Sequence, residues 1–434
     1  MRTSRPTLRA GAAALALCAF LPAPGAGGLA PSAWAKPPAD ADARRLVEAV
    51  FSAAPPDRAK ALAALAPVDA LTPVEAEAWR KPLLALAAKG PKAPTKGKAF
   101  LYAKPERGLF YFSGGANQGG LLVALHGGGA GAGDAGGAAS AFSGAAAGLK
   151  MWLAAPEVLD KTEHGWTDPP ETERFVMDLV EQLKRAGKLD PNRIYLTGHS
   201  MGGYGTWTLG AVYADTFAGL AAFAGAPTCT RTGPSAPISG VQDGILPNLR
   251  NLPIFVYQSL DDRNVPAESN EFATAELDRL AKEDPGGYEH VYERVDGRGH
   301  DFPKKGPEPG VAWAAKHVRN PRPSKVVWQP SRAWKRNFYW LWWERPALGG
   351  TVTVETKARN AFEVSATGPV DGLTVLLDDR LADLSKEVVV KVNGKETFRG
   401  VPRLSLATMV RSAVERNDAD LLFVAEVPVE GVGR

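Results

Sequence analysis

The amino-acid sequence predicts an α/β fold, in which a mostly parallel sheet carries helices on both faces, followed by a small β-rich domain. Between residues 99 and 320, short apolar runs alternate with amphipathic stretches, as in parallel sheets that are buried on both sides. After residue 320, apolar runs follow one another closely, with turn residues between them. The length of 434 residues exceeds that of one ordinary domain, so two or three units are expected.

The α/β region, residues 99–320, contains five predicted strands and three predicted helices. The strands are Leu121–Leu125, Ile194–Thr197, Leu220–Ala224, Ile254–Gln258 and Val291–Val295. The helices are Glu171–Ala186, Glu268–Lys282 and Met201–Val212. Five apolar residues of the first helix share one face, which is typical of a helix that covers a sheet.

The region before the sheet, residues 36–98, is a predicted helical segment that ends in a linker. Residues 40–89 are rich in Ala, Leu, Glu and Arg with helical spacing. Pro55-Pro56 and Thr72-Pro73 divide this stretch into two or three short helices.

The region after the sheet, residues 321–434, is a predicted β-rich domain with sandwich-like packing. Asn393-Gly394 predicts a hairpin turn, and one helix is expected at about Ser405–Glu415. The predicted strands are Val326–Trp328, Phe338–Trp343, Thr351–Thr356, Phe362–Ala366, Leu373–Leu377, Val388–Val392 and Leu421–Ala425.

Residues 1–35 form a predicted secretory signal peptide. Three arginines make its start basic, Gly11–Leu21 is apolar, and Ala33-Trp34-Ala35 is a small-x-small cleavage site. Removing this segment lowers the net charge from +4 to +1, because it contains three arginines and no acidic residue. We therefore expect a bacterial periplasmic or extracellular protein without nucleic acid or an anionic membrane as partner. Cys229 would be its only cysteine, which excludes an intramolecular disulfide.

A G-x-S-x-G motif, Gly198-His199-Ser200-Met201-Gly202, is the central functional signal. A predicted strand leads into it and a predicted helix leads out of it, as in a tight turn that exposes a nucleophilic serine. Glycines are needed at such a turn because a side chain there would clash. The amino end of the helix also favours the negative charge that develops nearby. Ser200 is therefore the candidate nucleophile.

The segment Leu125-His126-Gly127-Gly128-Gly129, at the end of a predicted strand, is a candidate part of an oxyanion hole. The amide of Met201 is the expected first donor, and Gly127 or Gly128 is the expected second. Such a donor is typically worth roughly 3 kcal/mol in the transition state. The alternative interpretation is a flexible loop, because residues 127–148 are largely Gly and Ala.

An acid and then a histidine should follow the serine along the chain. The strand after Ser200 ends at Ser259, and Asp261 and Asp262 directly after it compete for the role of the acid. The D-x-x-V-P pattern favours Asp262, which leaves Asp261 as a solvated turn residue. His300, in a loop after the strand that ends at Val295, is the expected general base.

Trp166, His199 and Tyr204 are candidate residues of a substrate pocket. For the Trp166 segment the alternative is structural, because Thr167 or Asp168 is suited to cap the following helix. His126 and His199 flank the glycine motifs, so local packing or hydrogen bonding is the alternative role for His199. No residues have metal-ligand spacing and no phosphate loop is found, so no cofactor is expected.

With these residues in place, the chain resembles the esterase and prolyl-oligopeptidase-type branch of the α/β-hydrolase superfamily. It is similar to secreted polyhydroxybutyrate-depolymerase-like and feruloyl-esterase-like proteins. The resemblance rests on residues 125–129, 189–207, 262–266 and 299–300, and spans roughly half of the chain. It implies the α/β-hydrolase fold and a triad of Ser200, Asp262 and His300. It does not extend to residues 40–90 or 325–434, and no β-propeller repeats precede the catalytic region.

The aromatic residues of the C-terminal region have two interpretations. Trp334 and the stretch Phe338–Trp343 are dense enough to suggest a carbohydrate- or polymer-binding face. A strand that is apolar on both faces is more often buried, which favours a core.

The sequence thus predicts an exported serine hydrolase that cleaves carboxylic esters, either small or polymeric. Fewer than thirty residues separate the strands near residues 224 and 253, too few for a large lid, so an open site is expected. A serine peptidase with the same residues is the first alternative. An inactive hydrolase scaffold that binds a polymer or carbohydrate is the second. The sequence leaves the oligomeric state open.

Overall fold

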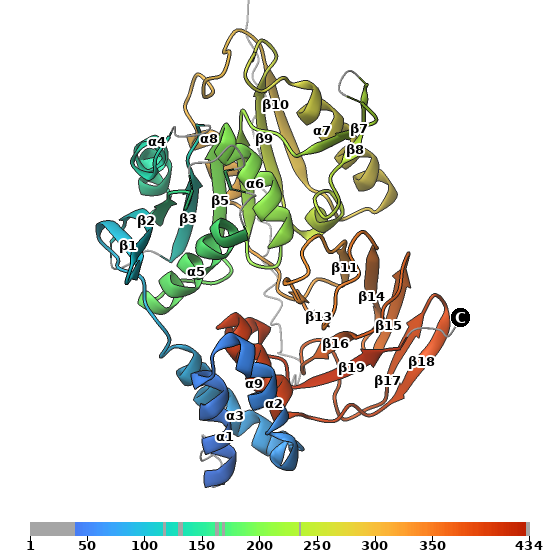
Figure 1. The fold of residues 1–434 in the computed structure, drawn as a ribbon. Coiled ribbons are helices and arrows are strands. Elements are labelled where there is room, and N and C mark those ends of the chain that lie inside the picture. Colours follow the sequence, from blue (N-terminus) through green and yellow to red (C-terminus); the bar gives the residue numbers. More distant parts are fainter. Residues whose placement is uncertain are drawn as a thin grey trace, which may run out of the picture.

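The computed structural model describes residues 40–115, 119–128, 133–160, 165–166, 170–233 and 236–430 (Figure 1). The predicted signal peptide therefore lies outside the described residues, as do Gly129, Thr167 and Asp168. Among the described helices, none is both long enough and apolar enough to cross a membrane.

An eight-stranded sheet forms the centre of the α/β region, in the spatial order β1-β2-β4-β3-β5-β6-β9-β10. β2 runs antiparallel to both of its neighbours, and every pair from β4 to β10 is parallel. This mostly parallel sheet, with a serine on the turn after β5, has the α/β-hydrolase fold that was predicted. The strands are β1 (Gly97–Ala103), β2 (Glu106–Ser113), β3 (Gly120–Leu125), β4 (Met151–Pro156), β5 (Ile194–His199), β6 (Gly219–Phe223), β9 (Ile254–Ser259) and β10 (His290–Val295).

Helices cover both faces of this sheet because its central strands are apolar on both sides. Leu121 and Val123 of β3 pack in one core with α5, α6 and α7, whereas Leu122 and Ala124 pack in another with α4 and α8. The helices are α4 (Ala135–Gly148), α5 (Pro170–Ala186), α6 (Met201–Val212), α7 (Glu268–Glu283) and α8 (Glu308–Ala314). The three helices predicted in this region are confirmed. α4 occupies much of residues 127–148, the segment for which a flexible loop was the alternative interpretation.

The connection between β6 and β9 contains a short hairpin rather than a large lid. It is formed by β7 (Cys229–Arg231) and β8 (Ile238–Val241), and the 3₁₀ turn η3 (Pro247–Asn251) follows. Arg231 ties the hairpin to α7 through a 2.7 Å ion pair with Glu268.

Two antiparallel-rich sheets make up the β-rich region, in the orders β11-β14-β15-β17-β18 and β12-β13-β16-β19. Their inner side chains meet, as where Trp328 of β11 packs edge-on against Trp343 of β13. Asn393-Gly394 forms the predicted turn between β17 and β18, with both residues at positive φ. The strands are β11 (Lys325–Trp328), β12 (Asn337–Phe338), β13 (Leu341–Trp343), β14 (Val352–Ala358), β15 (Ala361–Ala366), β16 (Leu373–Leu377), β17 (Val388–Val392), β18 (Lys395–Gly400) and β19 (Ala425–Val429).

Two strand predictions in this region were wrong. The run Phe338–Trp343 is not one strand, because the chain reverses at Tyr339, which has φ +50, and pairs Phe338 with Leu341 in a hairpin. The last strand begins at Ala425, where the predicted strand ends. Leu421 ends the 3₁₀ turn η4 (Ala419–Leu421), and residues 422–424 are coil. All four are buried, Leu421 and Phe423 in one core and Leu422 and Val424 in another.

The N-terminal helices pack against a helix from the other end of the chain. α1 (Ala41–Ser52), α2 (Arg58–Ala63) and α3 (Pro73–Ala87) share a core with α9 (Leu406–Arg416). Thr72 caps α3 in a capping box with Glu75, at the break that the sequence predicted. Two backbone hydrogen bonds, Leu71 N to Leu404 O and Leu406 N to Asp69 O, tie the two ends of the chain together. Figure 1 shows this helical unit, in blue and red, beside the α/β region.

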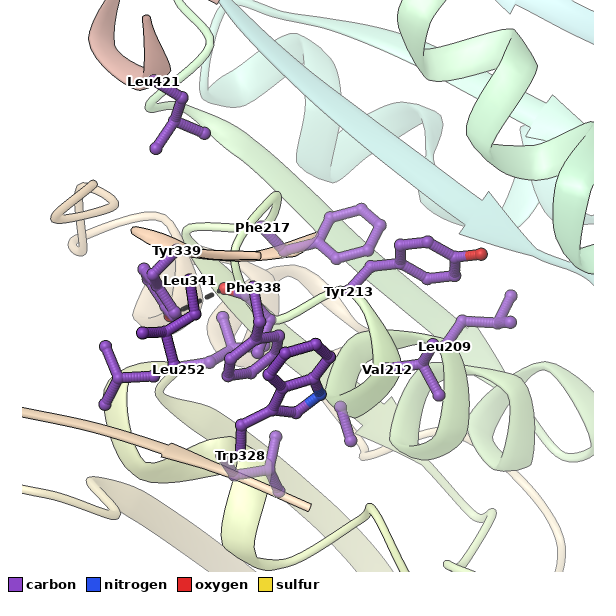
Figure 2. Close-up of a cluster of buried hydrophobic side chains, with 14 of the residues drawn as sticks. Leu209, Val212, Tyr213, Phe217, Leu252, Trp328, Phe338, Tyr339, Leu341 and Leu421 are labelled. Carbon is purple, nitrogen blue, oxygen red and sulfur yellow. Dashed lines mark hydrogen bonds between the residues drawn. The ribbon is translucent and has the colours of Figure 1, made fainter. Parts of the chain in front are cut away.

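The aromatic stretch Phe338–Trp343 of the β-rich region is a core and not an exposed binding face, whereas Trp334 lies outside this core. Phe338 and Trp340 are fully buried, and Trp334 is 39% exposed. Figure 2 shows Trp328, Phe338 and Tyr339 packed against residues of α6 and the turn that follows it. The β-rich region is therefore joined to the α/β region by a continuous hydrophobic core.

A buried ion cluster lies at the same junction. Asp215, which follows α6, bonds to Lys335 of the β-rich region at 2.9 Å and also to Arg416 at the end of α9. Burial raises the pKa of Asp215, but the two cations reverse this effect and hold the pKa below its usual value. Arg319 and Asp418 form a second buried pair across the junction, at 2.5 Å. The three parts of the chain thus meet around fixed charges.

Candidate active site

The turn between β5 and α6 holds Ser200 in a strained conformation, with φ +57 and ψ −122. Such a conformation costs a non-glycine residue of order 1–3 kcal/mol and is concentrated at functional sites. The glycines of the motif are required by space. A Cβ atom at Gly198 would lie 2.3 Å from the carbonyl oxygen of Gly202, and one at Gly202 would lie 2.1 Å from that of Leu125.

Ser200, His300 and Asp262 come together at the carboxyl edge of the sheet, although 100 and 38 residues separate the successive partners. The Nε2 atom of His300 lies 2.8 Å from Ser200 Oγ. The Nδ1 atom of the same ring lies 2.7 Å from Asp262 Oδ2. With Nδ1–H donating to the carboxylate, Nε2 is free to accept the serine proton, which is the arrangement of an activated nucleophile.

Asp262 is held by a buried polar network. Its Oδ1 atom accepts hydrogen bonds from the backbone amides of Asn264 and Val265, at 2.8 and 2.9 Å. Gln258 donates from Nε2 to Asp262 Oδ2 at 3.3 Å, and its own Oε1 accepts a hydrogen bond from Asn270 of α7 at 2.8 Å. Gln258 and Asn270 are fully buried. Sequence reasoning missed both, because an amide on a strand or helix has no motif that distinguishes it.

Asp261 is exposed and lies in a turn, as predicted, but it also makes hydrogen bonds that sequence reasoning missed. Its Oδ1 atom accepts hydrogen bonds from Ser259 Oγ at 2.5 Å, Gly299 N at 2.9 Å and Arg298 N at 3.1 Å. Asp261 therefore binds the loop that carries His300, and it does not reach the imidazole ring itself.

Two of the predicted oxyanion residues, Met201 and Gly127, lie next to Ser200. Met201 is the first residue of α6, so its amide has no acceptor within the helix. A Cβ atom at Gly127 would lie 3.2 Å from the Cβ of Ser200, so this position closely approaches the nucleophile. Gly128 has φ +112, a conformation that side chains disfavour. The donor roles of Met201, Gly127 and Gly128 stay predictions.

His126 supports this segment and has a structural role. It is 2% exposed, and its Nε2 atom accepts a hydrogen bond from Val158 N at 3.2 Å. Its Nδ1 atom faces the carbonyl of Gly127 at 2.8 Å. The ring therefore links the end of β3 to the segment that follows β4.

Trp166 does not fit the predicted role of lining a substrate pocket. It is 1% exposed, and its indole N–H donates to the carbonyl oxygen of His126 at 3.0 Å. A Cβ atom at Gly205 would lie 2.7 Å from the Cβ atom of Trp166 and 2.8 Å from its ring atom Cγ, so Trp166 packs directly on this glycine. Trp166 thus supports the oxyanion segment from within the core.

Tyr204, on the first turns of α6, is partly exposed and lies near Asp262. Burial raises the pKa of its hydroxyl, and the nearby Cys229 and Asp262 raise it further. It therefore remains a neutral hydroxyl at ordinary pH, and its pocket role stays a prediction.

His199 packs directly beside the catalytic candidate His300, with ring centroids 5.0 Å apart, and against Phe302 at 4.5 Å. Among the described residues, its buried Nε2 atom has no hydrogen-bond partner. Burial lowers the pKa of His199 to about 4, and the positive form of His300 disfavours its protonation further. His199 is therefore neutral at neutral pH.

This low pKa predicts acid sensitivity. Below about pH 6.5 the unfolded chain protonates His199, whereas the folded protein does not until about pH 4. Folding stability from this group is therefore present above pH 6.5 and is lost as the pH falls toward 4. In His199→Phe, we expect the free energy of unfolding, measured by denaturant titration, to fall less steeply across this interval. If the free energy of unfolding depends on pH equally steeply in the variant and the wild type, the low pKa of His199 is contradicted.

The strand order and the strained serine turn define the class of this protein, which has the α/β-hydrolase fold. No family model matches the chain. It is 30% identical over 86 residues to poly(3-hydroxyalkanoate) depolymerase C of Paucimonas lemoignei, over 18% of this chain and 21% of that protein. It is 32% identical over 155 residues to NocK of Nocardia uniformis subsp. tsuyamanensis, a protein provisionally named an esterase, over 36% of this chain and 40% of that protein.

The chain thus spans less than half the length of either of these curated relatives. Among solved structures, it is similar to a phospholipase/carboxylesterase from Dyadobacter fermentans, with 17% identity and a TM-score of 0.35. That match covers 52% of this chain and 97% of the other. The fold assignment rests on the strand order of this chain itself.

Proposed function

We propose that the protein is a serine hydrolase that cleaves carboxylic esters through an acyl-enzyme on Ser200. The observation that carries this proposal is the continuous hydrogen-bonded line from Ser200 through His300 to Asp262, with distances of 2.8 and 2.7 Å. The nucleophile stands on a strained turn, as in other hydrolases of this fold.

Each member of the triad has a distinct task in this mechanism. His300 Nε2 removes the proton of Ser200 Oγ as the oxygen attacks the ester carbonyl, and then delivers it to the leaving alkoxide. Asp262 keeps the proton on Nδ1 and stabilises the imidazolium that forms. The amides of Met201 and of Gly127 or Gly128 stabilise the oxyanion. Water then repeats the sequence on the acyl group, and the carboxylic acid is released.

An ester is the proposed substrate because both curated relatives carry names that denote ester cleavage. The short hairpin between β6 and β9 supports an open site, which suits bulky or polymeric acyl groups as well as small ones.

Comparable inhibition by small and bulky organophosphates is the expected result for an open site. Selective inhibition by the small reagents would argue for a covered one.

The experiment that tests the proposed function is labelling by a fluorophosphonate probe. We expect stoichiometric modification, and mass spectrometry of the digested protein should locate the adduct on Ser200. A matched panel of ester and amide substrates then separates an esterase from a peptidase. If folded protein is not labelled and no ester is cleaved, the serine hydrolase proposal is wrong.

We also propose that the protein is exported, on the basis of the basic start, apolar run and cleavage site within residues 1–35. Expression of the full chain in a bacterium, with N-terminal sequencing of the mature product, tests this proposal. A mature N-terminus at Lys36 is expected. An uncleaved cytoplasmic product would contradict it.

A further inference from the structure

We infer that Asp261 is a positioning residue, whose carboxylate holds the backbone of the loop that presents His300 to Ser200. The inference rests on the proposed function and extends it to a residue outside the triad. The two adjacent aspartates would then have separate roles. Asp262 binds the imidazole ring, and Asp261 binds the loop from which the ring projects.

A single oxygen atom of Asp261 makes the contacts with the loop. Asp261 Oδ1 accepts three hydrogen bonds, from the hydroxyl of Ser259 and from the consecutive backbone amides of Arg298 and Gly299. Arg298 N also donates to Ser259 Oγ at 3.1 Å, which closes the group. Among the described residues, no hydrogen bond reaches the second oxygen, Oδ2. One oxygen thus makes every contact with the loop.

The loop that carries His300 has a shape suited to binding a carboxylate. Gly297 and Gly299 have φ values of +73 and +55, a conformation that turns neighbouring amides toward one side. Consecutive backbone N–H groups arranged in this way form a concave anion-binding site. Asp261 occupies this site from the end of β9. The Ser259 hydroxyl and next the Gly299 amide lower the pKa of Asp261, so the carboxylate is ionised at neutral pH.

The loop is held on both sides of His300. On the far side, the guanidinium of Arg298 donates to the carbonyl oxygen of Phe302 at 3.0 and 3.2 Å. The Phe302 ring packs against His199 and Phe223. His300 lies between these two anchors, so its ring position depends on the backbone that Asp261 holds. A shift of about 1 Å in a catalytic group can lower the rate by roughly 100-fold.

The test compares Asp261→Ala with Asp261→Asn in steady-state hydrolysis of p-nitrophenyl butyrate. Alanine removes all three hydrogen bonds, and we expect kcat to fall about 10- to 100-fold with KM nearly unchanged. Asparagine keeps an acceptor at Oδ1 and changes only the unpartnered oxygen, so it should recover most of kcat. Asp296→Ala is the matched control, because this exposed carboxylate begins the same loop and makes no hydrogen bond or ion pair among the described residues.

A second measurement does not require turnover. The low-field proton resonance of His300 Nδ1–H, assigned by its loss in His300→Ala, should broaden or shift in Asp261→Ala and stay sharp in Asp261→Asn. If Asp261→Ala matches Asp296→Ala in both kcat and this resonance, Asp261 is not a positioning residue. An asparagine variant as slow as the alanine variant would also overturn the inference. Absence of labelling and turnover in the wild type would instead defeat the proposed function, and the resonance would still report on the loop.

Discussion

Replacing Ser200 with alanine is expected to lower kcat for ester hydrolysis by roughly 10⁴- to 10⁶-fold, the range found when a triad serine is removed. The reason is that Ser200 Oγ is the atom that would form the acyl bond, and no other hydroxyl lies against His300 Nε2 among the described residues. KM should change little, because the alanine side chain leaves the substrate's binding surface in place. Initial rates on a soluble ester, together with fluorophosphonate labelling, measure the loss.

We also expect the losses of kcat on substituting Ser200 and His300 not to add, because the residues of a catalytic triad act together. His300→Ala alone should lower kcat about as much as Ser200→Ala does. The kcat of the double variant should be no lower than that of either single variant. Additive losses would mean that the two residues do not share one step. Ser143→Ala, on the exposed face of α4, is the matched control and should keep wild-type kcat.

Replacing Asp215 with asparagine is expected to lower the free energy of unfolding by roughly 3–5 kcal/mol, the typical cost of breaking a buried ion pair from one side. Asp215 is fully buried, and its carboxylate is the shared partner of Lys335 and Arg416. Without it two cations remain close together in the core, with no carboxylate bonded to either among the described residues. Equilibrium unfolding in guanidinium chloride measures the change.

Asp379→Asn is the matched control for this second prediction. Asp379 pairs with Arg80 at 3.1 Å, but its side chain is 74% exposed. Exposed ion pairs contribute about 0–1 kcal/mol, so this variant should be nearly neutral. An Asp215→Asn variant as stable as the control would mean that the buried cluster does not hold the three parts of the chain together. Full labelling of Ser200 in the surviving folded fraction would show that the cluster acts on stability rather than on chemistry.

Much of the candidate site could be predicted from local sequence. The G-x-S-x-G motif, the strand before it and the helix after it placed Ser200, because a tight turn between a strand and a helix requires glycines at fixed offsets. His300 was predicted from chain order and from its loop after the strand that ends at Val295. The motif and the strand-to-loop pattern are read directly from the sequence, so they do not require knowledge of the fold. Trp166 was misread because an isolated tryptophan in a loop carries no information about which side of the chain faces the core.

The β-rich region was predicted less well, for a physical reason that Phe338–Trp343 makes clear. A short apolar run does not reveal whether the chain continues or turns, since the hairpin at Tyr339 uses a non-glycine residue at positive φ. Leu421–Ala425 is buried by two separate cores without pairing as a strand over most of its length. In both segments, burial explains why the residues are apolar. Hydrogen bonding with distant segments determines their backbone conformation.

The sequence by itself determined the fold class and predicted Ser200 as the nucleophile, because both depend on periodicity and on local turn chemistry. The sequence favoured Asp262 over Asp261 as the partner of His300, and only the tertiary structure showed that Asp261 binds the loop of His300. The tertiary structure also decided that α9 belongs with α1–α3, and that Asp215 joins residues 120 and 201 positions away. The reason is that contacts across such separations depend on how whole elements pack, and this packing produces no periodic pattern in the sequence.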